Sequence, residues 1–256
     1  MYQEERMLAI LEHLKKNKRV SVQELCDLFG ISRDTARRDL VRLDEEGTII
    51  RTRGGAILPT LNKEVQGYKE RLRAEPAVKE EIGRMAASLI RDGDYVIMDA
   101  STTVQFAARY LKAKDVVVVT NSIDIADILT EKEGVSIHLL GGLLHKKHRY
   151  VYGAATIEKL KEYRVDKVLF GASGITEEGL FFPHDEDGYV IRETIRRADQ
   201  TVVLADSTKF DRRFFHRVCG LEEIDWIVAD RIPTEAIRDV LEEKEIKVME
   251  GKETND

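Results

Sequence analysis

The chain has 256 residues, of which 43% are apolar and 34% are charged, and its formal net charge is −6. This composition predicts a folded protein of one or two domains and excludes a disordered or collagen-like chain. No apolar run approaches the roughly 20 residues that a membrane-spanning helix needs, and the polar start of the chain does not resemble a signal peptide. The two cysteines, Cys26 and Cys219, predict no disulfide framework. We therefore expect a cytoplasmic protein with no membrane partner.

Positive charge is concentrated near the start of the chain. Residues 1–58 contain 11 Lys/Arg and 10 Asp/Glu, whereas the remaining residues contain 30 and 37. Six arginines crowd into a short stretch of this region: Arg33, Arg37, Arg38, Arg42, Arg51 and Arg53. An acidic chain with one arginine-rich end indicates that this end contacts an anion, while the rest of the chain has another role.

The first 58 residues carry the signals of three helices and a hairpin. A first helix is predicted by leucines at helical spacing, Leu8, Leu11 and Leu14. Ser21 and Glu24 have the spacing of a capping box at the start of a short second helix. A third helix is predicted over 33–46, followed by two short strands at 48–51 and 56–58. This order is typical of a winged helix-turn-helix.

The start of the third predicted helix carries side chains that suit the major groove of DNA. The alternative is a small helical bundle in which the arginines pair with nearby acids such as Asp34, Asp39 and Asp44. The order of the elements favours DNA over that alternative. The residues that we expect to contact double-stranded operator DNA are Ser32, Arg33, Thr35, Arg37 and Arg38 on the helix and Arg51 and Arg53 on the hairpin.

Four segments of this region closely resemble the DeoR-type bacterial transcription regulators: 20–25, 31–40, 43–47 and 53–56. Ala36 stands where the family usually has isoleucine, which is a minor departure. The resemblance implies a winged helix-turn-helix that binds an operator, in a repressor that works as a homo-oligomer, either a dimer or a tetramer.

The remainder of the chain predicts a second domain of a different class. Residues 59–78 have no clear periodicity and are expected to be a linker. From residue 79 to residue 256, short β-branched runs alternate with helical stretches, which is typical of an α/β fold whose mostly parallel sheet is buried on both faces. The expected strands are 95–98, 116–119, 137–140, 168–170, 201–204 and 226–228, and the expected crossover helices are 103–111, 123–129, 154–163, 190–198 and 234–243.

Polar and small residues follow most of the predicted strands. In open α/β sheets, ligands bind outside the carboxyl ends of the strands, and a hydroxyl-rich turn that opens a helix suits a phosphate. Each of these groups is also ordinary turn and helix-cap chemistry, but together they predict a site for a small phosphorylated ligand. Its expected residues are Asp99, Ser101, Thr102, Thr103, Asn121, Ser122, Gly142, Gly171, Asp206 and Lys209.

This second part also resembles the sensor domain of the DeoR-type regulators, which is similar in fold to ribose-5-phosphate isomerase. The segment 99–103 looks like the family's Asp-x-Gly-Thr-Thr phosphate loop, and the resemblance implies a phosphorylated sugar or a related metabolite as effector. Two positions depart from the family. Ser101 replaces a glycine, and Ile191 replaces a lysine, so we expect Arg192 or the basic loop 146–149 to supply the missing charge, or an uncommon effector.

Two further classes of function were weighed. His145 and His148 lie three residues apart, but their neighbours are lysines and an arginine, which repel a metal ion, so we expect neither a metal nor another cofactor. An isomerase would need an acid and a base such as Asp99, Glu193 or Asp206, but a DNA-binding domain makes ligand sensing sufficient, and we expect no enzyme activity. The alternatives are a phosphosugar isomerase-like enzyme with an accessory helical domain and a nucleic-acid-binding adaptor with a ligand-free α/β body.

Overall fold

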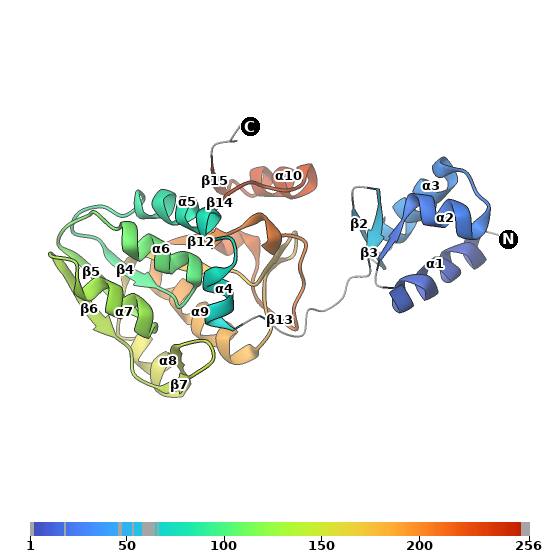
Figure 1. The fold of residues 1–256 in the computed structure, drawn as a ribbon. Coiled ribbons are helices and arrows are strands. Elements are labelled where there is room, and N and C mark those ends of the chain that lie inside the picture. Colours follow the sequence, from blue (N-terminus) through green and yellow to red (C-terminus); the bar gives the residue numbers. More distant parts are fainter. Residues whose placement is uncertain are drawn as a thin grey trace. The chain divides into compact units, whose positions relative to one another are not determined.

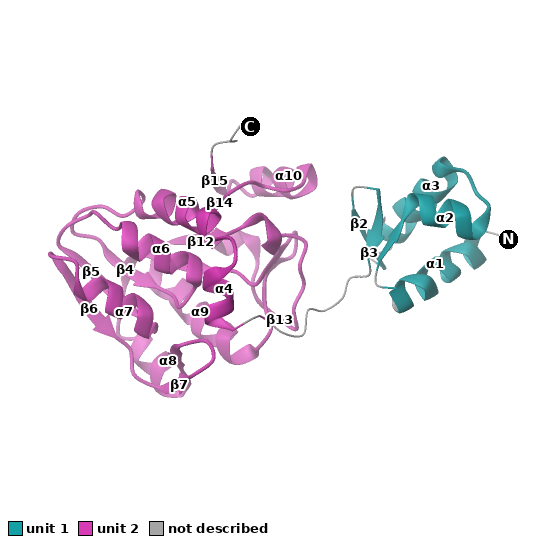
Figure 2. Ribbon diagram, in the orientation of Figure 1, with its two compact units in different colours: residues 1–61 teal, residues 62–256 magenta. Residues whose placement is uncertain are grey.

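The structure is a computed structural model, in which the chain forms two compact units, residues 1–61 and 62–256 (Figures 1 and 2). The residues that it describes are 3–17, 19–45, 48–52, 54–57, 65 and 67–251. Within these ranges, no helix has the length and the apolar surface that crossing a bilayer requires. Each unit has its own apolar core, so the two are described separately.

The first unit is a winged helix-turn-helix, as the sequence predicts. Three helices pack around a core that includes Ile10, Leu14, Leu25 and Leu40. The predicted capping box is present, because the Ser21 hydroxyl accepts a 3.1 Å hydrogen bond from the amide of Glu24. In chain order the elements are α1 (Gln3–Asn17), β1 (Arg19–Ser21), α2 (Val22–Phe29), α3 (Arg33–Glu45), β2 (Ile50–Thr52) and β3 (Gly55–Ile57). The strand β1 was not predicted; it pairs with β3, which gives the wing three strands in the order β1-β3-β2.

A buried ion pair joins α1 to α3. The guanidinium of Arg6 contacts both carboxylate oxygens of Asp39, with Nε 2.5 Å from Oδ2 and Nη2 3.1 Å from Oδ1. Asp39 is only 1% exposed. Because the pair is buried and its geometry is bidentate, losing one partner leaves an uncompensated charge in the interior.

Replacing Asp39 by asparagine is expected to destabilise the first unit by about 3 kcal/mol, since Arg6 loses its counter-charge. Hydrogen exchange of residues 3–57 in the full-length chain would measure this, and the slowest amides are expected to exchange roughly a hundredfold faster. Asp34→Asn is the matched control, because Asp34 is exposed on the same helix. Equal exchange rates in the Asp39 and Asp34 variants would contradict a structural role for the pair.

The second unit is built on a seven-stranded sheet in which all neighbours are parallel, in the order β15-β14-β12-β9-β4-β5-β6. Its strands are β4 (Tyr95–Met98), β5 (Val116–Thr120), β6 (Val135–Leu139), β9 (Val165–Gly171), β12 (Ala198–Ala205), β14 (Trp226–Ala229) and β15 (Lys247–Glu250). The six predicted strands are confirmed to within a few residues. The α/β class is therefore confirmed, with β15 as an additional edge strand.

Helices cover both faces of this sheet, as Figure 1 shows. Apolar residues of α5 (Pro76–Ala87), α6 (Thr102–Tyr110) and α7 (Ile123–Thr130) form one core cluster with the sheet. Those of α8 (Ala154–Leu160), α9 (Asp185–Arg197) and α10 (Glu235–Glu243) contribute to a second cluster. The helices that the sequence predicts between the strands therefore pack their apolar residues against the sheet.

Short antiparallel elements and two 3-10 turns complete the unit and were not predicted. The hairpin strands β7 (Leu143–His145) and β8 (Tyr150–Tyr152) pair with each other. A second small sheet has the order β10-β11-β13, and its strands are β10 (Gly174–Thr176), β11 (Gly179–Phe182) and β13 (His216–Cys219). The 3-10 turns are η1 (Ser207–Lys209) and η2 (Leu221–Glu223). Strands of three or four residues are too short to show an alternating pattern in the sequence.

Part of the predicted linker, residues 59–78, is helical. A six-residue helix, α4 (Tyr68–Arg73), lies within it, and α5 begins at Pro76. Tyr68 is 1% exposed and its hydroxyl donates to Gln105 of α6. The Lys79 ammonium donates to the backbone carbonyls of Arg71 and Ala74, which ties the end of α4 to α5. These tertiary contacts stabilise α4, which is too short to give a periodic signal in the sequence. Residues 68–78 therefore belong to the second unit.

Candidate functional site

The start of α3 presents two arginines that have no partner among the described residues. Arg37 and Arg38 are both exposed, and neither makes a hydrogen bond or an ion pair with any residue that the structure describes. Two of the acids expected to pair with them in the helical-bundle alternative are engaged elsewhere, because Asp39 binds Arg6 and Asp44 accepts from the amide of Arg51. Two free guanidinium groups on an exposed helix surface are suited to an anionic partner.

The other residues that we expect at this surface differ in their exposure and in their hydrogen-bond partners. The hydroxyl of Ser32 accepts from the amide of Thr35 and therefore caps α3. Arg33 is exposed and donates a 2.7 Å hydrogen bond to the Gln23 side chain on α2. Arg51 lies exposed on β2, while Arg53 lies outside the described residues. The structure thus describes six of the seven predicted residues. Ser32 lies just before α3, four lie on α3 and Arg51 lies on the wing.

A cavity of 410 Å³ lies in the second unit, outside the carboxyl ends of β4, β9 and β12. Eight of the ten residues predicted for the effector line it: Asp99, Ser101, Thr102, Thr103, Asn121, Gly171, Asp206 and Lys209. Ser122 and Gly142 do not. Ser122 is fully buried and caps α7 by accepting from the amide of Ile125, and a Cβ at Gly142 would lie 2.2 Å from Thr156 Oγ1, so that glycine serves close backbone packing.

The sequence missed several residues of this cavity. Arg71 comes from α4, Lys79 from α5, Tyr150 from β8, Asp187 from α9 and Arg212 from the loop after η1. His148, which also lines the cavity, belongs to the predicted basic loop 146–149. Arg71 lay in a segment interpreted as a linker, and the others do not follow a predicted parallel strand. The rule that ligands meet the carboxyl ends of strands could therefore not find them.

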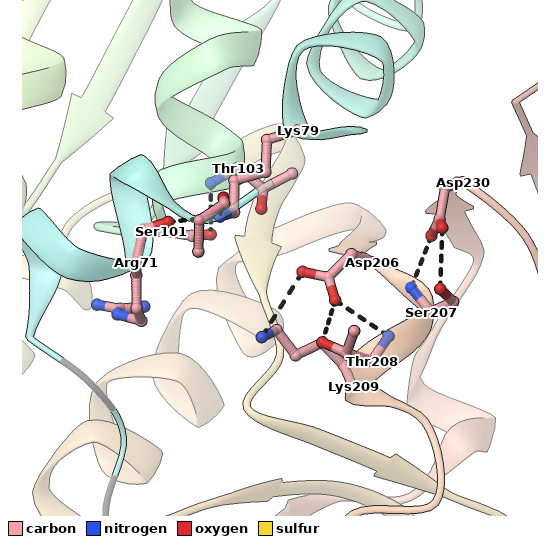
Figure 3. A network of polar contacts seen from close by, with 10 residues as sticks. Arg71, Lys79, Ser101, Thr103, Asp206, Ser207, Thr208, Lys209 and Asp230 are labelled. Carbon is pink, nitrogen blue, oxygen red and sulfur yellow. Dashed lines mark hydrogen bonds and ion pairs between the residues drawn. The ribbon is translucent and has the colours of Figure 1, made fainter. Parts of the chain in front are cut away.

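Lys209 and Asp206 form the first part of the polar network in the cavity (Figure 3). The ammonium nitrogen of Lys209 lies 3.6 Å from Asp206 Oδ2, and burial lowers the pKa of Lys209 while Asp206 acts in the opposite direction. The second carboxylate oxygen of Asp206 accepts from the amide and the hydroxyl of Thr208. The preceding residue, Ser207, is fixed by two hydrogen bonds to Asp230. Lys209 thus projects into the cavity from a well-supported turn.

Arg71 contributes the second cation. Its side chain comes from α4 and lines the cavity beside the network (Figure 3), and its Nε is buried without a hydrogen-bond partner among the described residues. Burial lowers the pKa of Arg71, but arginine starts so high that it stays charged. Burial also lowers the pKa of Lys79, a neighbouring cation at the wall. A buried charge without a partner is costly, so this arrangement is suited to a bound anion.

The predicted phosphate loop opens α6. Ser101 is the N-cap of this helix, and its hydroxyl accepts a 3.2 Å hydrogen bond from the amide of Thr103. The serine fits because the facing residue is Gly171, where a Cβ would lie 2.2 Å from Ser101 Oγ. The partial positive charge of the helix N-terminus adds to the field of the cations.

The charge missing at Ile191 is supplied by neither predicted source. Ile191 lines the cavity, but Arg192 turns away and donates to the carbonyls of Val218 and Arg217. In the basic loop 146–149, Arg149 pairs with Asp124 at 2.8 Å. Two other cations line the cavity, Arg71 from α4 and Lys79 from α5, and the alternative of an uncommon effector stays a prediction.

The opposite part of the lining is acidic and aromatic. Burial, and next the nearby charge of Asp187, raise the pKa of Asp99 to about 7. The Tyr150 hydroxyl donates a hydrogen bond to Asp187. His148 is 8% exposed and burial lowers its pKa to about 4, so it is neutral at physiological pH. Among the described residues, no group of three His, Cys, Asp or Glu side chains has the arrangement of a metal site.

Comparisons with known proteins agree with both units. The model of the DeoR-like helix-turn-helix domain matches residues 6–61, and that of the DeoR C-terminal sensor domain matches residues 74–231. The HTH-type transcriptional repressor GlcR of Bacillus subtilis (strain 168) is 51% identical over 249 residues, covering 97% of this chain and 96% of the relative.

More distant relatives are also named as repressors. The glycerol-3-phosphate regulon repressor of Escherichia coli (strain K12) is 30% identical over 97% of this chain and 99% of its own length. The lactose phosphotransferase system repressor of Lactococcus lactis subsp. lactis is 32% identical over 90% and 92%. Among solved structures, ribose 5-phosphate isomerase A from Methanocaldococcus jannaschii is similar at 17% identity with a TM-score of 0.38, covering 54% of this chain and 55% of that one. The two domain matches and the full-length relatives show that this chain is a member of the DeoR family of helix-turn-helix transcriptional repressors.

Proposed function

We propose that the chain represses genes of sugar or polyol metabolism and that a phosphorylated sugar or a related metabolite in the cavity of the second unit controls its affinity for the operator. The observation that carries the effector proposal is the set of cations around the cavity. Arg71, Lys79 and Lys209 converge on a space of 410 Å³ beside the amino end of α6. Phosphate has the negative charge and the hydrogen-bond acceptors that suit such a set of cations.

For the operator, we propose that the start of α3 enters the major groove. Arg37 and Arg38 would contact base edges or phosphates there, with Ser32, Arg33 and Thr35 beside them and Arg51 on the wing. Arg53, which lies outside the described residues, is proposed to contact DNA as well. The full-length relatives that are named as repressors support this assignment.

A sugar phosphate also fits the rest of the lining. Asp99, Asn121 and Asp206 supply acceptors and an amide for sugar hydroxyls, while Ser101, Thr102 and Thr103 supply hydroxyls and amides for the phosphate. Two of the relatives are named after a phosphorylated metabolite and a sugar phosphotransferase system. An effector changes operator affinity only if it binds the DNA-competent and the incompetent states differently.

The protein is proposed to act as a homo-oligomer, either a dimer or a tetramer. Operators of helix-turn-helix proteins are commonly near-palindromic, so two recognition helices must reach half-sites about 34 Å apart. One copy of the chain has one such helix, α3. Pairing of two copies would therefore supply one recognition helix for each half-site.

Titration of a protein–operator complex with a panel of phosphosugars tests the proposal. Fluorescence anisotropy is expected to show at least one phosphosugar that changes operator affinity, while the same sugars without phosphate have no effect. That phosphosugar should also raise the unfolding temperature, because it binds the folded state. Lys209→Ala is expected to keep operator binding and to weaken the effector response. If no phosphosugar in the panel changed either measurement, the effector proposal would be wrong.

A further inference from the structure

One wall of the cavity is formed by the stretch of chain that leads in from the first unit. The first unit ends at Leu61. The residues of the following stretch that line the cavity are Val65, Arg71, Ala74, Glu75 and Lys79. The helix α4 lies within this stretch. A ligand in the cavity therefore meets the same part of the chain that connects the second unit to the helix-turn-helix.

The position of α4 in this wall depends on contacts outside the helix itself. The Tyr68 hydroxyl donates to Gln105 of α6, and the Tyr68 amide donates to the carbonyl of Lys147 at 3.2 Å. The Lys79 ammonium of α5 donates to two backbone carbonyls at the end of α4. A helix of six residues is not stable in water on its own. Weakening or strengthening such contacts therefore decides whether α4 stays docked in the wall.

The turn between α4 and α5 is strained. Glu75 has a φ of 46°, in the left-handed region that residues other than glycine seldom adopt. Such a conformation persists only where the surrounding contacts impose it. Release of α4 from the wall would let Glu75 relax, so the backbone at this turn favours a second arrangement in which α4 is not docked.

Two cations of this wall have donors for an anionic ligand. An ammonium group has three donors, and Lys79 uses two of them on the carbonyls of α4. Nε of Arg71 is buried and has no hydrogen-bond partner among the described residues, although Asp99 and Asp187 line the same cavity. A ligand that accepts from Arg71 on α4 and from Lys79 on α5 would join the two helices through the cavity.

We propose that α4 is the element that couples the cavity to the operator-binding unit: a phosphorylated ligand that binds Arg71 holds α4 in the cavity wall and so fixes the point from which the linker to the helix-turn-helix starts. A ligand that prefers the docked arrangement shifts the protein toward it. Operator affinity then changes because the docked and released arrangements start the linker at different points. The proposal rests on the proposed sensing of phosphosugars and identifies the segment through which that sensing acts.

Hydrogen exchange on the full-length chain tests the docking step. The probes are hexose 6-phosphates and pentose 5-phosphates, and calorimetry establishes which of them bind. A bound probe is expected to slow exchange of the amides of residues 68–74 by at least about fivefold. The amides of α10, which contributes no residue to the cavity, serve as the internal reference. In Arg71→Gln, at probe concentrations that saturate the variant, this protection is expected to fall below about twofold.

A second variant tests docking without changing the cavity lining. Tyr68→Phe removes the hydrogen bond to Gln105, and neither residue lines the cavity. Without probe, the amides of α4 should exchange about tenfold faster than in the wild type, and a bound probe should then protect them by a larger factor. Tyr95→Phe is the matched control, because Tyr95 is exposed on β4, and it should leave both quantities unchanged.

A flexible glycine-serine insertion after Leu61 tests the transmission to DNA. The bound probe should still protect α4, while the ratio of operator affinities with and without probe, measured by fluorescence anisotropy, should fall to about one. A probe that binds without protecting α4 more than α10, unchanged protection in Arg71→Gln, unchanged exchange in Tyr68→Phe, or a wild-type ratio in the insertion variant would overturn the proposal. Absence of binding by every probe would overturn the proposed function as well, so the two failures are distinguishable.

Discussion

A chain in which Arg37 and Arg38 are both replaced by alanine is expected to lose about 2–6 kcal/mol of operator binding free energy, which is at least roughly thirtyfold in affinity. Both side chains are exposed and without partners among the described residues. Their removal therefore costs the fold little, and the loss falls on the complex with DNA. Fluorescence anisotropy with a labelled operator fragment measures the affinity, and circular dichroism checks that the helices persist.

The matched control for this prediction is a double alanine variant of Arg91 and Arg231, two exposed arginines of the second unit. It changes the net charge by the same amount, so a general electrostatic effect would weaken binding equally in both variants. The salt dependence of operator binding shows whether Arg37 and Arg38 contact phosphates or base edges. If both contact phosphates, the slope of log affinity against log salt should fall by about two in the variant. Wild-type affinity in the Arg37/Arg38 variant would show that α3 does not carry operator recognition.

The first unit could be predicted from sequence almost completely because its signals are local. A capping box at Ser21 and Glu24, a glycine after α2 and apolar residues at helical spacing each act over a few residues. The strand β1, which was not predicted, pairs with the distant strand β3, with Val20 opposite Ala56. A three-residue stretch of sequence carries no signal of that pairing. The buried Arg6–Asp39 pair is likewise a contact over 33 residues.

The cavity could be predicted only in part, and the reason is topological. Parallel strands bring their carboxyl ends to one edge of a sheet, which is why residues following β4, β9 and β12 were found together. Arg71 and Tyr150 reach the same space from a short helix and a hairpin strand that have no periodic signal. Ser122 was predicted for the same reason as Ser101, which lines the cavity, but the hydroxyl of Ser122 caps α7 and Ser122 does not line the cavity.

Arg71 and Ile191 line the same cavity. The lysine that the family resemblance places on α9 is replaced by an apolar side chain, while a guanidinium from α4 enters the same cavity. Because Nε of Arg71 is buried and lacks a hydrogen-bond partner among the described residues, the protein carries the cost of one unsatisfied N–H donor. An anionic ligand would remove that cost on binding, so this side chain is expected to have a large effect on effector affinity and none on the contacts of α3.

Replacing Arg71 by glutamine is therefore expected to weaken effector binding by about 1.5–3 kcal/mol, which is roughly ten- to a hundredfold, because charge-assisted hydrogen bonds to phosphate are lost. Without effector, the variant should unfold at the same temperature as the wild type or higher, since a buried unpaired cation is removed. Operator affinity should be unchanged. Arg73→Gln is the control, because Arg73 is exposed two residues further along α4 and does not line the cavity. Calorimetry and thermal unfolding with and without phosphosugar measure these effects. Effector affinity that stays within twofold of wild type in Arg71→Gln, or a comparable loss in Arg73→Gln, would remove Arg71 from the binding site.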